Sequence, residues 1–272
     1  MNILVIGVGV VGFATAYGLM HKGGHSVYVY DVDRAKIQHA KQFGIKEHEK
    51  ACYDAVMICV NAPTLDSKSR PQDTTQVEAA LRFAKRHSGK ETLIAVRTTL
   101  LPTTTRRLAN EIIPGHTLLC YNPEFLREKT SLIDFMQPTR IVIGELNPES
   151  GAKLEQIYEA WECPKIHMTL EEAEMTKYVA NAFLAAKISF FNEVQAWCRM
   201  LKLDYNVIAQ ATTLDPRIGQ YGAKPLGAFG GKCLPKDTKA LLLFLHKRGL
   251  PNNMIEATLR VNAACSTRSP NC

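Results

Sequence analysis

The sequence predicts an α/β protein in which a doubly wound parallel sheet is followed by a mostly helical domain. Short apolar runs alternate with helix-patterned segments through the first half of the chain, and a glycine-rich turn follows the first run. The alternation stops near residue 168, where a long run of helix formers begins. Alternation of this kind is typical of a parallel sheet covered by helices on both faces.

The predicted strands are short runs rich in Val, Ile and Leu, which suit strands that are buried on both faces of a sheet. They cover residues 2–6, 26–30, 55–59, 92–96, 117–120 and 140–143. Helical patterns fall between them, at about residues 10–22, 33–43, 74–87 and 102–112. We therefore expect a Rossmann-like nucleotide-binding domain over residues 1–168.

The second half of the chain is predicted to be helical. Thr169 and Glu172 fit a capping box at the start of a helix that runs to about residue 200. We expect this part, residues 169–265, to serve as a central and dimerisation domain, and residues 266–272 to form a frayed tail. Further helices are expected at 204–213, 236–247 and 251–264, after a loop rich in glycine and proline at 215–235.

The composition is that of an ordinary globular protein, with 46% hydrophobic and 22% charged residues among 272. The net charge is +7, but the basic residues are scattered, which argues against nucleic-acid binding and suits an anionic small substrate. No apolar run approaches the ~20 residues that span a bilayer, and we expect the N-terminal run to be a strand rather than a signal peptide. The eight cysteines show no metal-ligand spacing, so we expect no metal and a cytoplasmic location.

The turn after the first predicted strand has the GxGxxG pattern of dinucleotide-binding proteins. Its glycines allow a tight turn, a close approach to a pyrophosphate, and close packing of helix on strand. Asp31 ends the second predicted strand, where a carboxylate can bind both ribose hydroxyls and repel a 2′-phosphate. The sequence therefore predicts NAD rather than NADP as the cofactor. The six residues of the turn are Gly7, Val8, Gly9, Val10, Val11 and Gly12.

A second glycine-rich segment, Gly230-Gly231-Lys232-Cys233-Leu234-Pro235-Lys236-Asp237, contains the candidate nucleophile. Pro235 suits the first turn of a helix, so Cys233 precedes that helix, where the dipole and Lys236 would stabilise a thiolate. Asp237 follows one turn later. This pattern favours nucleophilic catalysis, and the alternative from the residues alone is a helix cap with a buried cysteine.

Lys177 and Asn181 form a second candidate group. They are four residues apart on the predicted long helix and share one face with apolar residues. Their position predicts a functional pair, and the alternative is an exposed lysine beside a capping-type asparagine.

Taken together, these motifs resemble the UDP-glucose/GDP-mannose dehydrogenase superfamily, over roughly residues 1–262. The Asp215–Gly219 and Cys233–Asp237 segments look most like bacterial UDP-glucose 6-dehydrogenases. The segments that carry the resemblance are Gly7–Gly12, Val60–Thr64, Arg97–Thr99, Asn122–Glu128, Pro138–Glu145, Glu174–Asn192, Leu214–Gly219, Phe229–Leu241 and Pro251–Asn253.

The resemblance implies oxidation of a sugar C6 alcohol to a carboxylate by two NAD⁺, through a thioester on Cys233. Lys177 and Asn181 match groups that stabilise an oxyanion, and Asp237 matches the acid/base partner of the thiol. Glu124 matches a residue linked to thioester hydrolysis, and Thr99 matches one that positions water.

The resemblance also implies the binding residues. Phe125, Leu126, Arg127, Lys224, Phe229 and Gly230 match parts of the substrate loops, and Arg217 matches an arginine that reaches the substrate of a neighbouring subunit, so we expect at least a homodimer. The NAD contacts implied outside the glycine turn are Lys36, Val60, Pro63, Thr64, Thr98, Glu128 and Lys236.

The sequence also departs from the superfamily's pattern. We expect the chain, which ends at Cys272, to lack the superfamily's third, C-terminal nucleotide-binding domain. The span from Asp31 to Ala55 is short, Ala62 stands where the superfamily often has threonine, and Thr103 where it often has glycine.

Two other functions remain open from the sequence. The chain could be a truncated, weakly active NAD-binding subunit of a full-length dehydrogenase, or a β-hydroxyacid dehydrogenase, which needs no cysteine. Among sugars, UDP-glucose is favoured, with GDP-mannose and UDP-N-acetylhexosamines as the alternatives.

Overall fold

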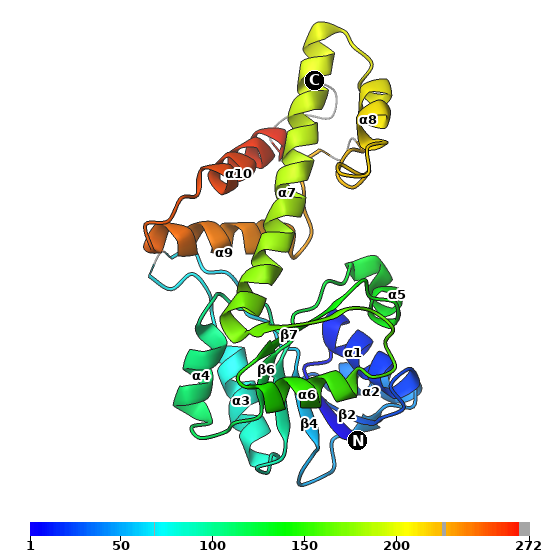
Figure 1. Cartoon of the computed structure of the whole chain (residues 1–272), viewed down its shortest axis with the longest axis vertical. Coiled ribbons are helices and arrows are strands. Elements are labelled where there is room, and N and C mark those ends of the chain that lie inside the picture. The colour runs from blue at the N-terminus through cyan, green and yellow to red at the C-terminus, as the bar shows by residue number, and fades with distance from the viewer. Residues whose placement is uncertain (68, 225–226, 267–272) are drawn as a thin grey trace. The chain divides into compact units, whose positions relative to one another are not determined.

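The computed structural model describes residues 1–67, 69–224 and 227–266 (Figure 1). The chain divides into two compact units. Unit 1 comprises Met1–Pro63 and Asp73–Lys177, and unit 2 comprises Thr64–Gln72 and the chain from Tyr178 onward. Most of the predicted tail at 266–272 lies outside the described residues.

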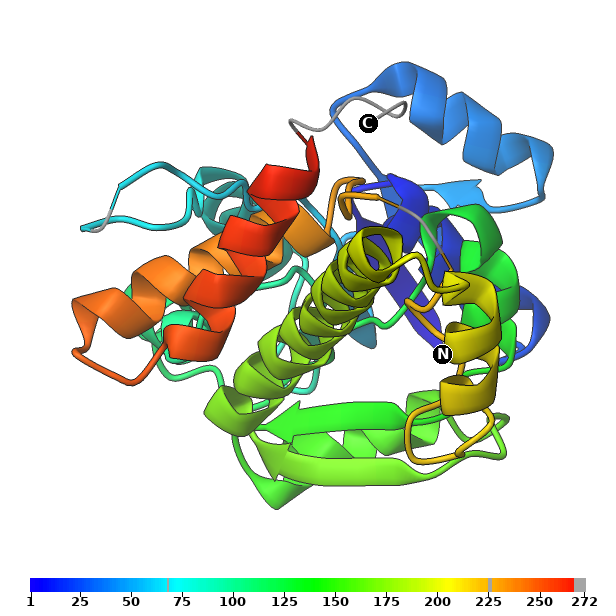
Figure 2. The ribbon, with the colours of Figure 1, turned by 90° about the horizontal axis from the view of Figure 1, so that it is seen from above.

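Unit 1 contains a sheet with the strand order β3-β2-β1-β4-β5-β6-β7-β8. Neighbouring strands pair in parallel except β6 and β7, which are antiparallel. Figure 2 shows β7 and β8 side by side at one edge. The strands are β1 (Asn2–Ile6), β2 (Ser26–Tyr30), β3 (Lys46–Glu47), β4 (Ala55–Ile58), β5 (Leu93–Val96), β6 (Leu119–Tyr121), β7 (Ile141–Glu145) and β8 (Lys165–Thr169).

Helices cover both faces of this sheet, so the predicted doubly wound α/β fold is confirmed. One buried cluster joins the sheet to α1, α2, α5 and α6, and the other joins it to α3, α4 and the start of α7. The helices of unit 1 are α1 (Val10–His21), α2 (Arg34–Gln42), α3 (Thr75–Arg86), α4 (Thr104–Ile112), the 3₁₀ turn η1 (Glu128–Thr130), α5 (Ser131–Met136) and α6 (Pro148–Ile157).

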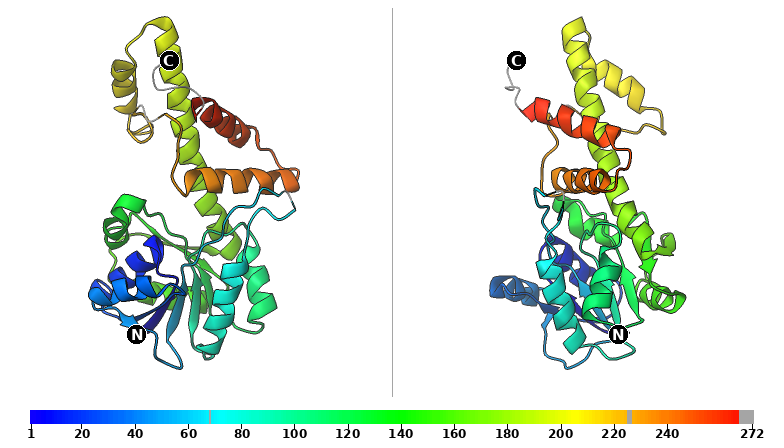
Figure 3. Two further views of the ribbon diagram at one scale, coloured as in Figure 1. Left: turned by 180° about the vertical axis from the view of Figure 1, so that it is seen from behind. Right: turned by 90° about the vertical axis from the view of Figure 1, so that its left-hand side faces the viewer.

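Unit 2 is helical, as predicted. The long helix α7 (Leu170–Leu201) begins in unit 1 and continues into unit 2. Figure 3 shows α8 (Tyr205–Thr213) returning along α7, where Phe191, Cys198 and Tyr205 share a small buried cluster. The helices α9 (Leu234–Lys247) and α10 (Asn253–Ser266) follow.

Sequence patterning missed several elements of unit 1. The strand β3 has two residues and α5 has six, too few for a periodic pattern. The edge strand β8 is largely exposed and carries polar residues, so it lacks the apolar run of a buried strand. The helix α6 had a readable signal, because Asn147 forms a capping box with Ser150 and Pro148 occupies the first turn.

The capping box predicted at the start of α7 is present. The hydroxyl of Thr169 accepts a hydrogen bond from the backbone N–H of Glu172, and the Glu172 carboxylate accepts from the backbone N–H of Thr169. Among the described residues, no helix combines the length and the hydropathy that a membrane crossing requires.

Candidate active site

The glycine turn joins β1 to α1. It lies at the carboxyl end of β1, at the point in the sheet where the strand order reverses. Gly7 has a φ of +88°, and a Cβ there would lie 2.9 Å from the backbone of Cys59. A Cβ on Gly12 would lie 1.8 Å from the carbonyl oxygen of Gly7. These two glycines are therefore required by the turn and by helix–strand packing, as predicted.

Gly9 has a different environment. It is exposed, caps the N-terminus of α1, and has no atom within 4 Å of the position its Cβ would occupy. The first turn of α1 contains no acidic residue. An open backbone at a helix N-terminus, with no competing carboxylate in that turn, fits the pyrophosphate of a dinucleotide.

Asp31 directly follows β2, beside the glycine turn. Its carboxylate accepts a hydrogen bond of 2.6 Å from the backbone N–H of Val8, and the Lys36 ammonium lies 3.7 Å from its other oxygen. Its side chain is mostly buried. Asp31 therefore stabilises the glycine turn itself, a role that the predicted contact with a ribose did not include.

The ends of β4 and β5 are joined by Thr98, whose hydroxyl donates to the carbonyl of Val60 at 2.8 Å. Thr99 follows and is half-buried. The carbonyl of Pro63 accepts from the backbone N–H of Asp73 at 2.8 Å, which closes the point where the chain leaves and re-enters unit 1. These predicted cofactor residues therefore follow the carboxyl ends of the parallel strands, as the glycine turn does.

Lys177 and Glu124 form a buried ion pair in unit 1. The Lys177 ammonium is 3.0 Å from the Glu124 carboxylate and donates to the Glu124 backbone carbonyl at 2.5 Å. The other carboxylate oxygen accepts from the backbone N–H of Leu126 at 2.7 Å. Side-chain exposures of 4% and 8% keep the pair out of solvent, so both groups are fixed before any ligand binds.

The loop after Glu124 carries the predicted substrate residues. The Phe125 ring lies 5.3 Å from the Lys177 ammonium and 3.9 Å from the guanidinium of Arg140, a residue that the sequence did not single out. The guanidinium of Arg127 pairs with Asp134 and lowers the pKa of that carboxyl to about 2. Glu128 begins the 3₁₀ turn and is exposed.

In unit 2, Cys233 is the exposed N-cap of α9. Its carbonyl accepts from the backbone N–H of Asp237 at 2.8 Å, the first helical bond of α9. Asp237 is only 1% exposed, and the Asn181 amide donates to its carboxylate at 2.7 Å. The Lys236 ammonium lies 2.8 Å from the other oxygen of that carboxylate. The predicted nucleophile is thus accessible, while the predicted acid/base residue is buried and held.

The remaining predicted residues of unit 2 are more dispersed. The hydroxyl of Thr64 donates to the Lys236 carbonyl at 3.0 Å, which attaches the segment Thr64–Gln72 to α9. Phe229 is buried, and Gly230 has open space around its Cβ position. Lys224 is exposed, and the exposed side chain of Arg217 is paired with Asp215.

Sequence reasoning did not single out two buried polar residues of unit 1. The Arg97 guanidinium donates to the hydroxyl of Tyr158 at 2.6 Å and to the amide oxygen of Asn122. Glu174 is fully buried at the base of α7. Its position in the sequence could have identified it, because it lies among the apolar residues of the buried stripe of α7 and three residues before Lys177.

The strand order and the glycine turn define a dinucleotide-binding α/β protein. Residues 45–162 match the NAD binding domain of the UDP-glucose/GDP-mannose dehydrogenase family, and residues 171–264 match its central domain. The chain belongs to this family, and the predicted cofactor, NAD, is confirmed with it.

Individual relatives agree with this assignment. The UDP-glucose 6-dehydrogenase TuaD of Bacillus subtilis is 33% identical over 96% of this chain and 62% of its own length. GDP-mannose 6-dehydrogenase of Pseudomonas aeruginosa is 31% identical over 97% of this chain and 68% of its own. The structure of a UDP-glucose dehydrogenase from Pyrobaculum islandicum superposes with a TM-score of 0.84 at 35% identity, over 97% of this chain and 68% of that one. This chain thus spans about two thirds of the length of these relatives.

Proposed function

We propose that this chain oxidises the C6 alcohol of a nucleotide sugar to a carboxylate, with UDP-glucose as substrate and UDP-glucuronate as product. The observation that carries the proposal is the exposed Cys233 thiol at the N-terminus of α9, one turn before the buried Asp237–Asn181 pair. The proposal places the NAD-binding domain in residues 1–168 and the nucleophilic thiol in residues 169–265.

NAD⁺, when bound, accepts the hydride in each of the two oxidations. The open backbone at Gly9 and the N-terminus of α1 would hold its pyrophosphate, and Asp31 its ribose. The Cys233 thiolate adds to the C6 aldehyde, and the resulting thiohemiacetal is oxidised to a thioester. Water then breaks the C–S bond, which releases the carboxylate and restores the thiol.

The charged groups have separate roles in this scheme. The Lys177 ammonium and the Asn181 amide stabilise negative charge on the C6 oxygen. Asp237 exchanges protons with the thiol, and Glu124 assists the attack of water, which Thr99 positions. The buried Lys177–Glu124 and Asn181–Asp237 contacts support these roles, because each predicted group already has a partner that fixes it.

A homodimer through unit 2 is part of the proposal. Large apolar side chains of α7 and α8 are exposed, an arrangement that favours association. A dimer would also allow Arg217 to reach a substrate bound by the partner subunit. The exposed residues include Phe183, Phe190, Trp197, Leu201 and Val207. Sedimentation of the purified chain tests this part, and a monomer at micromolar concentration would contradict it.

The decisive experiment measures NADH formed per sugar consumed by the purified chain with UDP-glucose and NAD⁺. Two NADH per sugar would support the full oxidation to the carboxylate. NAD binding without NADH formation would favour a subunit that depends on a full-length partner. GDP-mannose and a UDP-N-acetylhexosamine serve as competing substrates, and faster turnover of either would replace UDP-glucose.

A further inference from the structure

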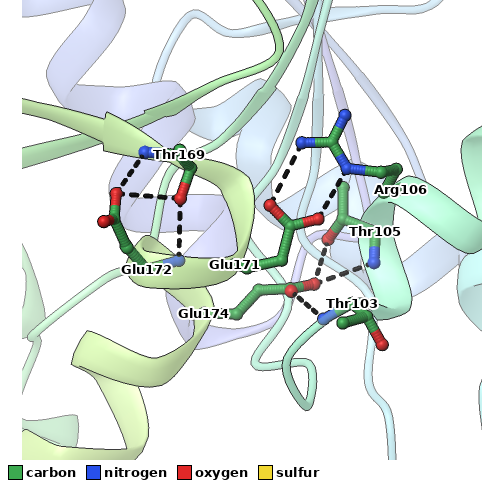
Figure 4. A network of polar contacts seen from close by, with 7 residues as sticks. All are labelled: Thr103, Thr105, Arg106, Thr169, Glu171, Glu172 and Glu174. Carbon is green, nitrogen blue, oxygen red and sulfur yellow. Dashed lines mark hydrogen bonds and ion pairs between the residues drawn. The ribbon is translucent and has the colours of Figure 1, made fainter.

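Glu174 lies at the base of α7 and contacts the start of α4 (Figure 4). One carboxylate oxygen accepts from the backbone N–H of Thr103 at 2.7 Å. The other accepts from the backbone N–H of Thr105 at 2.8 Å and from its hydroxyl at 2.7 Å. The nearby guanidinium of Arg106 is directed to Glu171 instead. A single carboxylate of α7 thus accepts three hydrogen bonds from the beginning of α4.

These contacts replace a missing local cap. The first backbone N–H groups of a helix need acceptors, which its own N-cap side chain usually supplies. Thr103, the N-cap of α4, makes no such bond and has a left-handed φ of +78°. Glu174 supplies the acceptor from another helix, and its negative charge suits the positive end of the α4 dipole. The three bonds therefore fix α7 against α4 both along its axis and in rotation.

Burial of the Glu174 carboxylate costs free energy that an apolar side chain at this position would not. Glu174 is 0% exposed, and loss of solvation raises its pKa to about 7 in spite of the three hydrogen bonds. An apolar residue of similar size would avoid that cost of desolvation. The retained carboxylate is thus better explained by a requirement for a defined position than by stability.

Lys177 follows Glu174 by three residues on the same buried stripe of α7. Its ammonium must meet both the carboxylate and the backbone carbonyl of Glu124, at 3.0 and 2.5 Å. A small rotation of α7 would break one of these two contacts. We propose that Glu174 is a positioning residue for Lys177, which it holds against Glu124 by binding the N-terminus of α4.

The same junction offers a matched control. Glu171 pairs with Arg106 at 2.6 Å, also between α7 and α4, but its side chain is 29% exposed and that of Arg106 is 40% exposed. Partly exposed ion pairs contribute little to structure. Loss of Glu171 should therefore leave Lys177 in place.

The test measures the rate at which a water-soluble acetylating reagent modifies Lys177, by peptide mass spectrometry, in the wild type and in Glu174→Ala, Glu174→Gln and Glu171→Gln. We expect Glu174→Ala to raise the Lys177 rate about fivefold or more, because the local opening that exposes the amine becomes more frequent. Glu174→Gln, which keeps one acceptor oxygen, should give a smaller rise. Glu171→Gln should give none, and exposed Lys129 should react equally in all four proteins.

Lys177 rates within twofold of wild type in both Glu174 variants would overturn the proposal. If Glu174→Ala does not fold, as judged by circular dichroism, Glu174→Gln decides the question alone. An equal rise in Lys177 and Lys129 would also overturn it, since that pattern indicates general loosening.

The consequence for catalysis rests on the proposed function. In Glu174→Gln, kcat for NADH formation should fall about tenfold while KM for the sugar nucleotide stays within twofold, because a misplaced group weakens the transition state more than binding. Acetylation of Lys177 needs no catalytic turnover, so the positioning role of Glu174 and the proposed function can be refuted independently. A wild type without activity but with the expected labelling would count against the proposed function only.

Discussion

The predicted catalytic groups of the two units differ in how exposed they are to solvent. In unit 1, Lys177 and Glu124 are both buried and paired with each other. In unit 2, Asp237 is equally buried, but Cys233 stands exposed at the start of α9. The charges that would stabilise a reacting oxygen are thus fixed in advance, while the thiol that would form and break a bond in the proposed reaction stays accessible. This difference predicts that unit 1 variants lose stability and that the Cys233 variant loses chemistry.

The largest effect is expected at Cys233. In Cys233→Ser, carboxylate formation should fall by about a hundredfold or more, because a hydroxyl does not replace the thiolate in forming a thioester. NAD binding, measured by calorimetry, should be unchanged, since the glycine turn lies in unit 1. Cys52→Ser, at another exposed cysteine, is the control and should retain activity. Carboxylate production by Cys233→Ser at the wild-type rate would rule out the thioester route.

A large effect on stability is expected at the buried pair of unit 1. Glu124→Ala leaves the Lys177 ammonium buried without its carboxylate, which should lower the free energy of unfolding by about 3 kcal/mol. Urea denaturation measures the change. Glu47→Gln, which breaks the pair with the exposed Arg34 in the same unit, should have a much smaller effect, because solvent screens that pair. Equal costs for the two variants would remove the distinction between buried and exposed pairs.

A smaller change, and a gain, is expected at Thr103. Its left-handed φ of +78° is strained for threonine and natural for glycine, so Thr103→Gly should stabilise the protein by about 1 kcal/mol. The backbone N–H that donates to Glu174 is retained in the variant. Thr139→Gly, at an exposed site, should not stabilise the protein. A lower melting temperature for Thr103→Gly than for wild type would contradict the inference that the Thr103 backbone is strained.

The smallest effect is expected at His167 of β8. Its ring lies between Glu145, at 2.6 Å, and Glu155, at 3.0 Å, and the hydrogen bond with Glu145 is the main reason that its pKa is raised above 6.5. A raised pKa means that the folded state binds the proton more tightly. The contribution to stability is therefore full below pH 6.5 and is lost as pH rises through the folded-state pKa.

His167→Gln should reduce the fall in melting temperature as pH rises above 6.5 by about a degree or two, a small effect because the site is partly exposed. Melting curves at several pH values, with His21→Gln as the control, measure this difference. A slope that His167→Gln leaves unchanged would show that other groups cause the pH dependence.

The sequence predicted the parts of the fold that repeat a simple rule. Buried parallel strands such as β1 and β4 are continuous apolar runs, and the glycine turn has a fixed spacing. The antiparallel β7 and the exposed β8 were harder, because pairing direction and edge position leave little trace in composition. The site residues stay predictions, chosen because a thiol, a lysine and carboxylates each suit a step of the proposed chemistry.

The partners of those residues could not be predicted in the same way. That Lys177 meets Glu124, and that Glu174 caps α4, depends on long-range contacts across more than fifty residues. The strain at Thr103 follows from the turn before α4, so the departure from the superfamily's glycine gains a physical meaning only in the structure. Motifs and the family resemblance suggested the residues, and the tertiary contacts show how each side chain is held.

The packing of α1 against α5 has a consequence for how the protein is made. Gly18 of α1 lies so close to the Phe135 ring that a Cβ would be 2.2 Å from it. Lys22 donates to the Met136 carbonyl at 2.7 Å, and Trp161 donates to the Phe135 carbonyl at 2.8 Å. Phe135 leaves the ribosome 117 residues after Gly18. The helix α1 is thus synthesised early, but the face that packs on α5 stays uncovered on the nascent chain until Phe135 has been translated.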